Sequence, residues 1–232
     1  MIRKLVLFDI DGTLLLSLGA GRRALVAAMG AELEQAEAVA AAVRFDGKTD
    51  PQIVREMFGA AGEPAVDDAR IDSVLERYIE CLREQLAQPG HRTEVMPGVP
   101  DLLDRVESEA VALLGLLTGN VATGAELKLR SGAIDPRRFR VGAFGSDHAV
   151  RSELPAIAAG RAESLFGRRP QGEEIVIIGD TPSDMICGLA VGARSIGVAT
   201  GAYSAAELSR AGAYAAFDDL SDQNAVWQAI SA

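Results

Sequence analysis

Short apolar runs alternate with amphipathic segments over most of the chain. The first run, residues 4–10 (KLVLFDI), ends in acidic residues and is followed by Gly12. Similar runs follow at residues 111–117, 139–144, 174–178 and 194–198. Continuous apolar runs of this length are typical of parallel strands that are buried on both faces.

Helical patterns separate these runs. One covers residues 99–106 after Pro97-Gly98, and another covers 121–130. Further helices are expected to begin near Ser152, Pro182 and Ser204. The alternation predicts an α/β fold with a doubly wound, Rossmann-like parallel sheet and helices on both faces. In such sheets ligands bind at the carboxyl ends of the strands.

Residues 18–90 interrupt this alternation. They contain at least three helical patterns and no clear strand pattern, and apolar residues recur at helical spacing from Ile71 to Leu86. We predict a small all-helical cap domain at 18–90, inserted into a catalytic core made of residues 1–17 and 91–232.

The charge balance limits the partners. The formal net charge is -10, with 33 acidic against 23 basic side chains, which disfavours nucleic acid and anionic membranes. The two cysteines indicate neither a disulfide framework nor a zinc site, and no apolar stretch is long enough to span a membrane. We expect a soluble, cytoplasmic monomer or homodimer whose partner is a small molecule.

Two carboxylates follow the first predicted strand. Asp9 and Asp11 project to the same side of an extended chain, and two like charges so close require a cation. With a divalent metal, Asp9 can attack phosphorus as a nucleophile, while Asp11 protonates the leaving alcohol and later activates water. The alternative is a plain Asp-Gly turn after an edge strand.

A hydroxyl and an amide follow the second run. Thr118, Gly119 and Asn120 precede a predicted helix, and the free N–H groups of a helix start favour a phosphate oxygen. The alternative is an ordinary helix N-cap by Thr118 or Asn120.

A third acidic motif follows the run at 174–178. Asp180 would project into the same crevice as Asp9, and its hard oxygen ligands suit magnesium. Asp184 can cap the following helix together with Thr181, a role that is compatible with metal binding.

Taken in order, the three motifs resemble the haloacid dehalogenase superfamily. The DxDGT, Thr and GDxxxD motifs lie at 9–13, 118 and 179–184, and the resemblance extends to PGV at 97–99 and TGN…KL at 118–129. Within the superfamily the chain looks like the phosphoglycolate phosphatase and β-phosphoglucomutase branch, which has a helical cap.

The resemblance assigns roles to individual residues. It makes Asp9 the nucleophile and Asp11 the acid and base. Phosphate would be bound by Thr118, Gly119, Asn120 and Arg151. Mg²⁺ would be held by Asp9, the Asp11 carbonyl and Asp180, with Asp184 nearby.

Two basic residues are candidates for contacts with the substrate. The third motif of the superfamily usually carries lysine, whereas the matching stretch here, residues 147–155, offers only Arg151. Arginine can neutralise and bind phosphate, although a surface position would leave the motif vacant. Lys48 at the start of a cap helix could contact the leaving group, as basic residues do in relatives, or it could be solvated.

These inferences predict a magnesium-dependent phosphatase that hydrolyses a small phosphorylated metabolite through an aspartyl-phosphate on Asp9. The alternative is a phosphomutase of the β-phosphoglucomutase type. Less favoured are a phosphonatase, which would need Lys48 for a Schiff base, and a non-catalytic module that only accepts a phosphoryl group.

Overall fold

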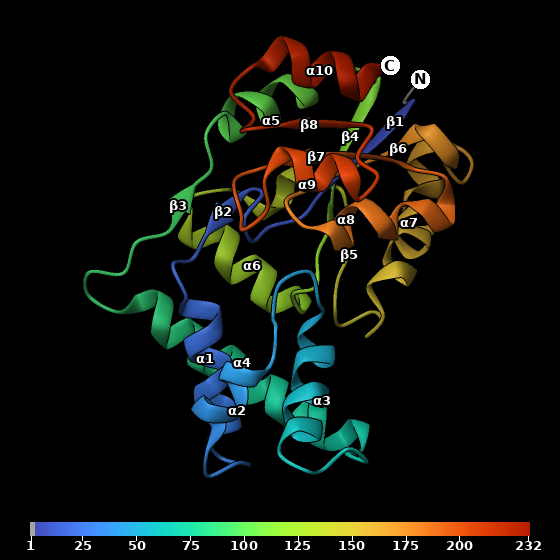
Figure 1. Cartoon of the computed structure of the whole chain (residues 1–232). Coiled ribbons are helices and arrows are strands. Elements are labelled where there is room, and N and C mark those ends of the chain that lie inside the picture. Colours follow the sequence, from blue (N-terminus) through green and yellow to red (C-terminus); the bar gives the residue numbers. More distant parts are fainter. Residues whose placement is uncertain (1–2) are drawn as a thin grey trace.

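The computed structural model describes residues 3–232 and confirms the α/β fold (Figure 1). A six-stranded, all-parallel sheet has the order β5-β4-β1-β6-β7-β8. The strands are β1 (Lys4–Phe8), β4 (Ala112–Leu117), β5 (Val141–Ala143), β6 (Ile175–Gly179), β7 (Arg194–Val198) and β8 (Ala215–Phe217). Because β1 lies between β4 and β6, the three motif-bearing strands are neighbours.

Helices cover both faces of the sheet. Val6 and Phe8 pack in the apolar cluster that includes α5 and α10, whereas Leu5 and Leu7 pack in the cluster that includes α7. This alternation follows from the two-residue period of a strand. The helices are α5 (Val99–Ser108), α6 (Ala122–Ser131), α7 (Leu154–Phe166), α8 (Pro182–Cys187), α9 (Ala205–Arg210) and α10 (Gln223–Ser231), with short 3-10 helices η1 (Pro136–Arg138), η2 (Arg151–Glu153), η3 (Gly172–Glu174) and η4 (Leu189–Val191).

Four helices form a separate body, at the bottom of Figure 1. They are α1 (Ala20–Met29), α2 (Ala36–Ala42), α3 (Asp50–Ala60) and α4 (Asp68–Ala87). Their buried side chains make an apolar cluster of their own, in which Tyr78 and Phe58 are the largest members. All four helices fall within residues 18–90, and the division of the chain at those residues stays a prediction.

A short antiparallel pair joins the two bodies. Strands β2 (Leu15–Leu16) and β3 (Glu94–Val95) pair where the chain leaves the sheet and where it returns. Strands of two residues carry no readable alternation, which is why the sequence pattern does not predict them. Within residues 3–232 no helix is both long enough and apolar enough to cross a membrane.

Candidate active site

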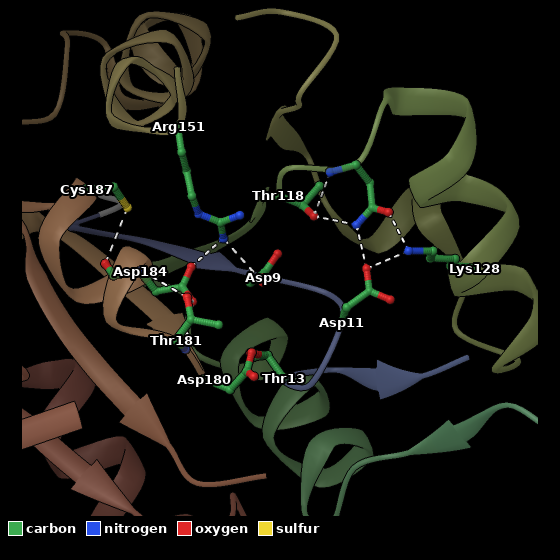
Figure 2. Close-up of polar contacts among 11 residues, drawn as sticks. Asp9, Asp11, Thr13, Thr118, Lys128, Arg151, Asp180, Thr181, Asp184 and Cys187 are labelled. Carbon is green, nitrogen blue, oxygen red and sulfur yellow. Dashed lines mark hydrogen bonds and ion pairs between the residues drawn. The ribbon is translucent and has the colours of Figure 1, made fainter. Parts of the chain in front are cut away.

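The three predicted motifs meet at the carboxyl edge of the sheet (Figure 2). Asp9 follows β1, Thr118 follows β4 and Asp180 follows β6, and all three line one cavity of about 250 Å³. Residues of α1 and of the loop that precedes α3 complete its wall. The strand ends therefore bring the predicted residues together between the sheet and the helical body.

Three buried carboxylates form one cluster. Oxygens of Asp9, Asp180 and Asp184 all lie within 4.8 Å of one another. The hydroxyl of Thr13 donates to Asp180 at 3.0 Å. Asp184 also accepts from the backbone N–H of Thr181, at 3.0 Å, in the capping box that begins α8. Asp184 therefore caps α8, as predicted, and is also a member of the carboxylate cluster.

Arg151 enters the same cluster from η2. Its side chain is only 7% exposed, it forms an ion pair with Asp184, and its Nη2 lies 3.2 Å from Oδ2 of Asp9. The alternative of a surface arginine at this position is therefore wrong. Its Nε–H is buried and has no hydrogen-bond partner among residues 3–232, which is the kind of donor that a phosphate oxygen can satisfy.

The cluster is short of positive charge. Burial raises the pKa of Asp9 to about 6; Arg151 opposes this rise, while Asp184 and Asp11 add to it. Burial and the neighbouring carboxylates of Asp184 and Asp9 also hold the pKa of Asp180 well above its usual range. The cluster holds three carboxylates and one guanidinium, that of Arg151, which pairs with Asp9 and Asp184. The carboxylate oxygens are the kind of ligand that a hard divalent cation prefers.

A second group of polar side chains surrounds Asp11. Lys128 Nζ donates to Oδ2 of Asp11 at 2.6 Å and to Oδ1 of Asn120 at 2.6 Å. The Asn120 amide donates to the same Asp11 oxygen at 2.8 Å and to the Thr118 hydroxyl at 2.8 Å. Asp11 therefore has protein partners of its own, and its carboxylate is not part of the three-carboxylate cluster.

The N-cap interpretation of Thr118 and Asn120 is also wrong. Helix α6 has no side-chain cap from its own N-cap residue, Val121. Instead, Oδ2 of Asp50, from the first turn of α3, accepts the backbone N–H of Val121 at 2.9 Å. A carboxylate from the helical body thus caps a helix of the sheet domain.

Two further contacts hold the start of α3 on the sheet domain. The Asp50 backbone N–H donates to the Gly119 carbonyl at 2.8 Å, and the Thr49 hydroxyl donates to the Ala149 carbonyl at 2.6 Å. A Cβ on Gly119 would overlap the carbonyl oxygen of Lys48, so glycine permits this close approach.

Lys48 lines the cavity, but its ammonium forms an ion pair with Glu56, eight residues further along the chain in α3. Its side chain is 23% exposed, so it is neither fully solvated nor free to meet a ligand in this arrangement. Contact between Lys48 and a leaving group stays a prediction.

Sequence reasoning missed Lys128 and Asp50. Lys128 lies next to Leu129 on the buried face of α6, together with Ala125, and a lysine on an apolar helix face was the available signal. Asp50 precedes Pro51, a pattern typical of a helix start, which gives no sign of a second role. Its contact with Val121, 71 positions away, could not be read from the chain.

Comparison with known proteins agrees with this geometry. The model of the haloacid dehalogenase-like hydrolases matches residues 6–188, and a HAD-hydrolase-like model matches residues 155–223. No curated protein matches the sequence.

Solved structures with the same fold span nearly the whole chain. A hydrolase from Pseudomonas syringae is 21% identical, with a TM-score of 0.71 and coverage of 99% of both chains. CbbY from Rhodobacter sphaeroides, in complex with phosphate, is 20% identical, with a TM-score of 0.71 and coverage of 97% of both chains. A predicted phosphoglycolate phosphatase from Haemophilus somnus is 16% identical, with a TM-score of 0.70 and coverage of 98% of both.

At these identities the solved structures establish the fold alone. The family model spans most of the chain, from β1 to α8, and therefore includes all three motifs. The chain belongs to the haloacid dehalogenase-like hydrolase family.

Proposed function

We propose that the protein is a magnesium-dependent phosphatase that transfers the phosphoryl group of a small phosphorylated metabolite to Asp9 and then to water. The observation that carries this proposal is the separation of two carboxylates in one cavity. Asp9 lies among buried carboxylates with Arg151, whereas Asp11 is held apart by Lys128 and Asn120. A nucleophile and an acid–base group need different surroundings of this kind.

In the first step an oxygen of Asp9 attacks phosphorus and a new P–O bond forms. The ester P–O bond breaks, its electron pair stays on the leaving oxygen, and that oxygen takes the proton carried by Asp11. In the second step Asp11 accepts a proton from water, whose oxygen attacks phosphorus. The bond between phosphorus and Asp9 then breaks, which restores the carboxylate and releases inorganic phosphate.

The residues around Asp9 suit the charges that this chemistry requires. Asp9 and Asp180, with the main-chain carbonyl of Asp11, would hold Mg²⁺, and Asp184 lies beside them. When bound, the cation supplies positive charge to the phosphoryl oxygens. Arg151 adds a second positive charge, and its unpartnered Nε–H is available to a phosphate oxygen.

The loop after β4 would bind the rest of the phosphoryl group. Thr118 is fully buried at the cavity wall, and the side chain of Asn120 is oriented by its bonds to Asp11 and Lys128. Gly119 also lines the cavity, and its missing Cβ lets the start of α3 approach closely. The small cavity favours a metabolite over a macromolecular substrate.

A panel of phosphorylated metabolites tests the proposal. Phosphate release should require Mg²⁺ and should be abolished by Asp9→Asn, while the exposed Asp101→Asn variant of α5 should match the wild type. The panel should include β-glucose 1-phosphate, because its conversion to glucose 6-phosphate without phosphate release would identify a mutase. An active Asp9→Asn variant, or a wild type that is inactive on every compound, contradicts the proposal.

A further inference from the structure

Lys128 is a buried charge to which the family motifs assign no role. Its side chain is 6% exposed, and it comes from the last turn of α6 rather than from a strand end. Burial lowers its pKa, but the carboxylates of Asp11 and Asp50 outweigh burial and hold the pKa above its ordinary value. The side chain is therefore a fixed cation at the cavity wall.

The contacts of Lys128 make the two oxygens of Asp11 unequal. Oδ2 accepts from Lys128 at 2.6 Å and from Asn120 at 2.8 Å (Figure 2). Oδ1 receives no hydrogen bond from residues 3–232, and the Asp11 side chain is 40% exposed at the cavity. The carboxyl group is thus anchored by one oxygen and open to a ligand at the other.

The surrounding chain is built to accept this lysine. A Cβ added to Gly21 in α1 would lie 3.2 Å from Lys128 Nζ, so the helical body leaves space for the ammonium at that point. Lys128 also donates to Asn120 Oδ1, and therefore fixes the amide that is the second donor to Asp11. Loss of the lysine would release both anchors of the Asp11 carboxyl group.

We propose that Lys128 is a positioning residue for phosphoryl transfer: it binds Oδ2 of Asp11 and orients Asn120, so that Oδ1 of Asp11 faces the leaving group. This inference rests on the proposed function, because it takes Asp11 as the group that protonates the leaving oxygen. It assigns Lys128 an effect on the reaction that is exerted only through Asp11, without contact with the substrate.

The dependence on the leaving group tests this role. Protonation matters for an alkyl phosphate, whose alkoxide is a poor leaving group, and matters little for p-nitrophenyl phosphate. We expect Lys128→Met to lower kcat/KM about 10- to 100-fold for alkyl phosphates, part of the usual contribution of a general acid, and far less for p-nitrophenyl phosphate. Arg130→Met, an exposed neighbour on the same helix, should match the wild type on both substrates.

A double-mutant cycle separates positioning from substrate binding. If Lys128 acts through Asp11, adding Lys128→Met to an Asp11→Asn variant should change kcat/KM for alkyl phosphates by less than about twofold. The same loss in both backgrounds would mean that Lys128 contacts the substrate directly, which overturns the proposal. An equal loss for alkyl and p-nitrophenyl phosphates would also overturn it.

Lys128→Gln is a second variant in case Lys128→Met does not fold. Glutamine removes the charge but keeps a hydrogen-bond donor close to Asp11. We expect an intermediate loss with the same dependence on the leaving group, with folding checked by circular dichroism and thermal unfolding. A uniform loss across substrates would count against the inference. Failure of the proposed function gives a different result, because the wild type would then hydrolyse no alkyl phosphate, or Asp9→Asn would hydrolyse them as fast as the wild type.

Discussion

The two sides of the cavity compensate the charges of their carboxylates in different ways. On the cation side, defined by Asp9, Asp180, Asp184 and Arg151, three carboxylates share one guanidinium. On the acid–base side, defined by Asp11, Asp50, Asn120 and Lys128, two carboxylates share one ammonium, and Asn120 and the Val121 N–H supply further donors.

This difference indicates which side requires a bound cation. The acid–base side has a protein cation or donor for each carboxylate, so it does not require a bound cation. The cation side has an excess of negative charge that only a bound cation or a protonated carboxyl group can relieve. Dependence on Mg²⁺ should therefore be a property of one side only.

The largest expected effect comes from removing the protein cation on each side. Arg151→Met leaves Asp184 and Asp9 buried without their partner, which should lower the free energy of unfolding by about 3–5 kcal/mol. Saturating Mg²⁺ should restore part of that loss. Lys128→Met should also destabilise the protein, but Mg²⁺ should stabilise this variant no more than it stabilises the wild type.

Denaturant unfolding with and without Mg²⁺ measures both variants. Exposed Arg130→Met serves as the control for loss of a surface charge. An equal response of the Arg151 and Lys128 variants to Mg²⁺ would remove the distinction between the two sides.

The next effect concerns the pH dependence of stability. Burial, opposed by Lys128 and the Val121 hydrogen bond, raises the pKa of Asp50 from 3.8 to about 6. The folded state then binds this proton more tightly than the unfolded state, so the contribution of Asp50 is most favourable below pH 4 and is lost as pH rises to 6. The loss amounts to roughly 3 kcal/mol, because each pKa unit corresponds to about 1.4 kcal/mol.

Asp50→Asn removes this titration. Relative to the wild type, the variant should gain stability between pH 4 and 6, as followed by unfolding at each pH, and the difference should be constant above pH 7. The exposed Asp72→Asn variant in α4 should show no such trend. A difference that does not change with pH would mean that Asp50 titrates normally in the folded state.

A slightly smaller effect is expected from the metal itself. A ligand at one hundred times its dissociation constant stabilises the folded state by about 2.7 kcal/mol. Mg²⁺ should raise the thermal unfolding midpoint of the wild type accordingly, and Asp180→Asn should abolish most of the shift. An unchanged shift in that variant would place the Mg²⁺ site elsewhere.

The smallest effect tests the junction between the two bodies. In Gly119→Ala the new Cβ would overlap the Lys48 carbonyl, and overpacking of this kind typically destabilises by about 1–3 kcal/mol. Gly160→Ala in α7 is the matched control, because nothing lies within 4 Å of the added Cβ. Equal unfolding midpoints for the two variants would show that the Lys48 carbonyl can move away from the new Cβ without loss of stability.

The cation side was far easier to predict from the sequence than the acid–base side. Asp9 and Asp180 directly follow buried strands, and parallel strands bring their carboxyl ends together whatever the loops do. The apolar runs also predicted the bounds of β4 and β7 closely. They did not predict β8, because its three residues are only half-buried.

The acid–base side depends on long-range packing. Asp50 meets Val121 and Lys128 meets Asp11 only after the helical body has docked on the sheet, so local patterns could not foresee either pair. The ion pair between Lys48 and Glu56 could not be foreseen either, because it joins residues eight positions apart and not the three or four of a helical pair.

The central claim is that Asp9 carries the phosphoryl group, and rapid acid quench during turnover tests it most directly. In the wild type with Mg²⁺ and an active substrate, the peptide that contains Asp9 should be isolated with a phosphoryl group that hydroxylamine removes, as an acyl phosphate requires. With p-nitrophenyl phosphate, whose leaving group needs little protonation, Asp11→Asn should still form this species, and Asp9→Asn should not. Turnover without any phosphorylated Asp9 peptide, or a label on another residue, would contradict the account.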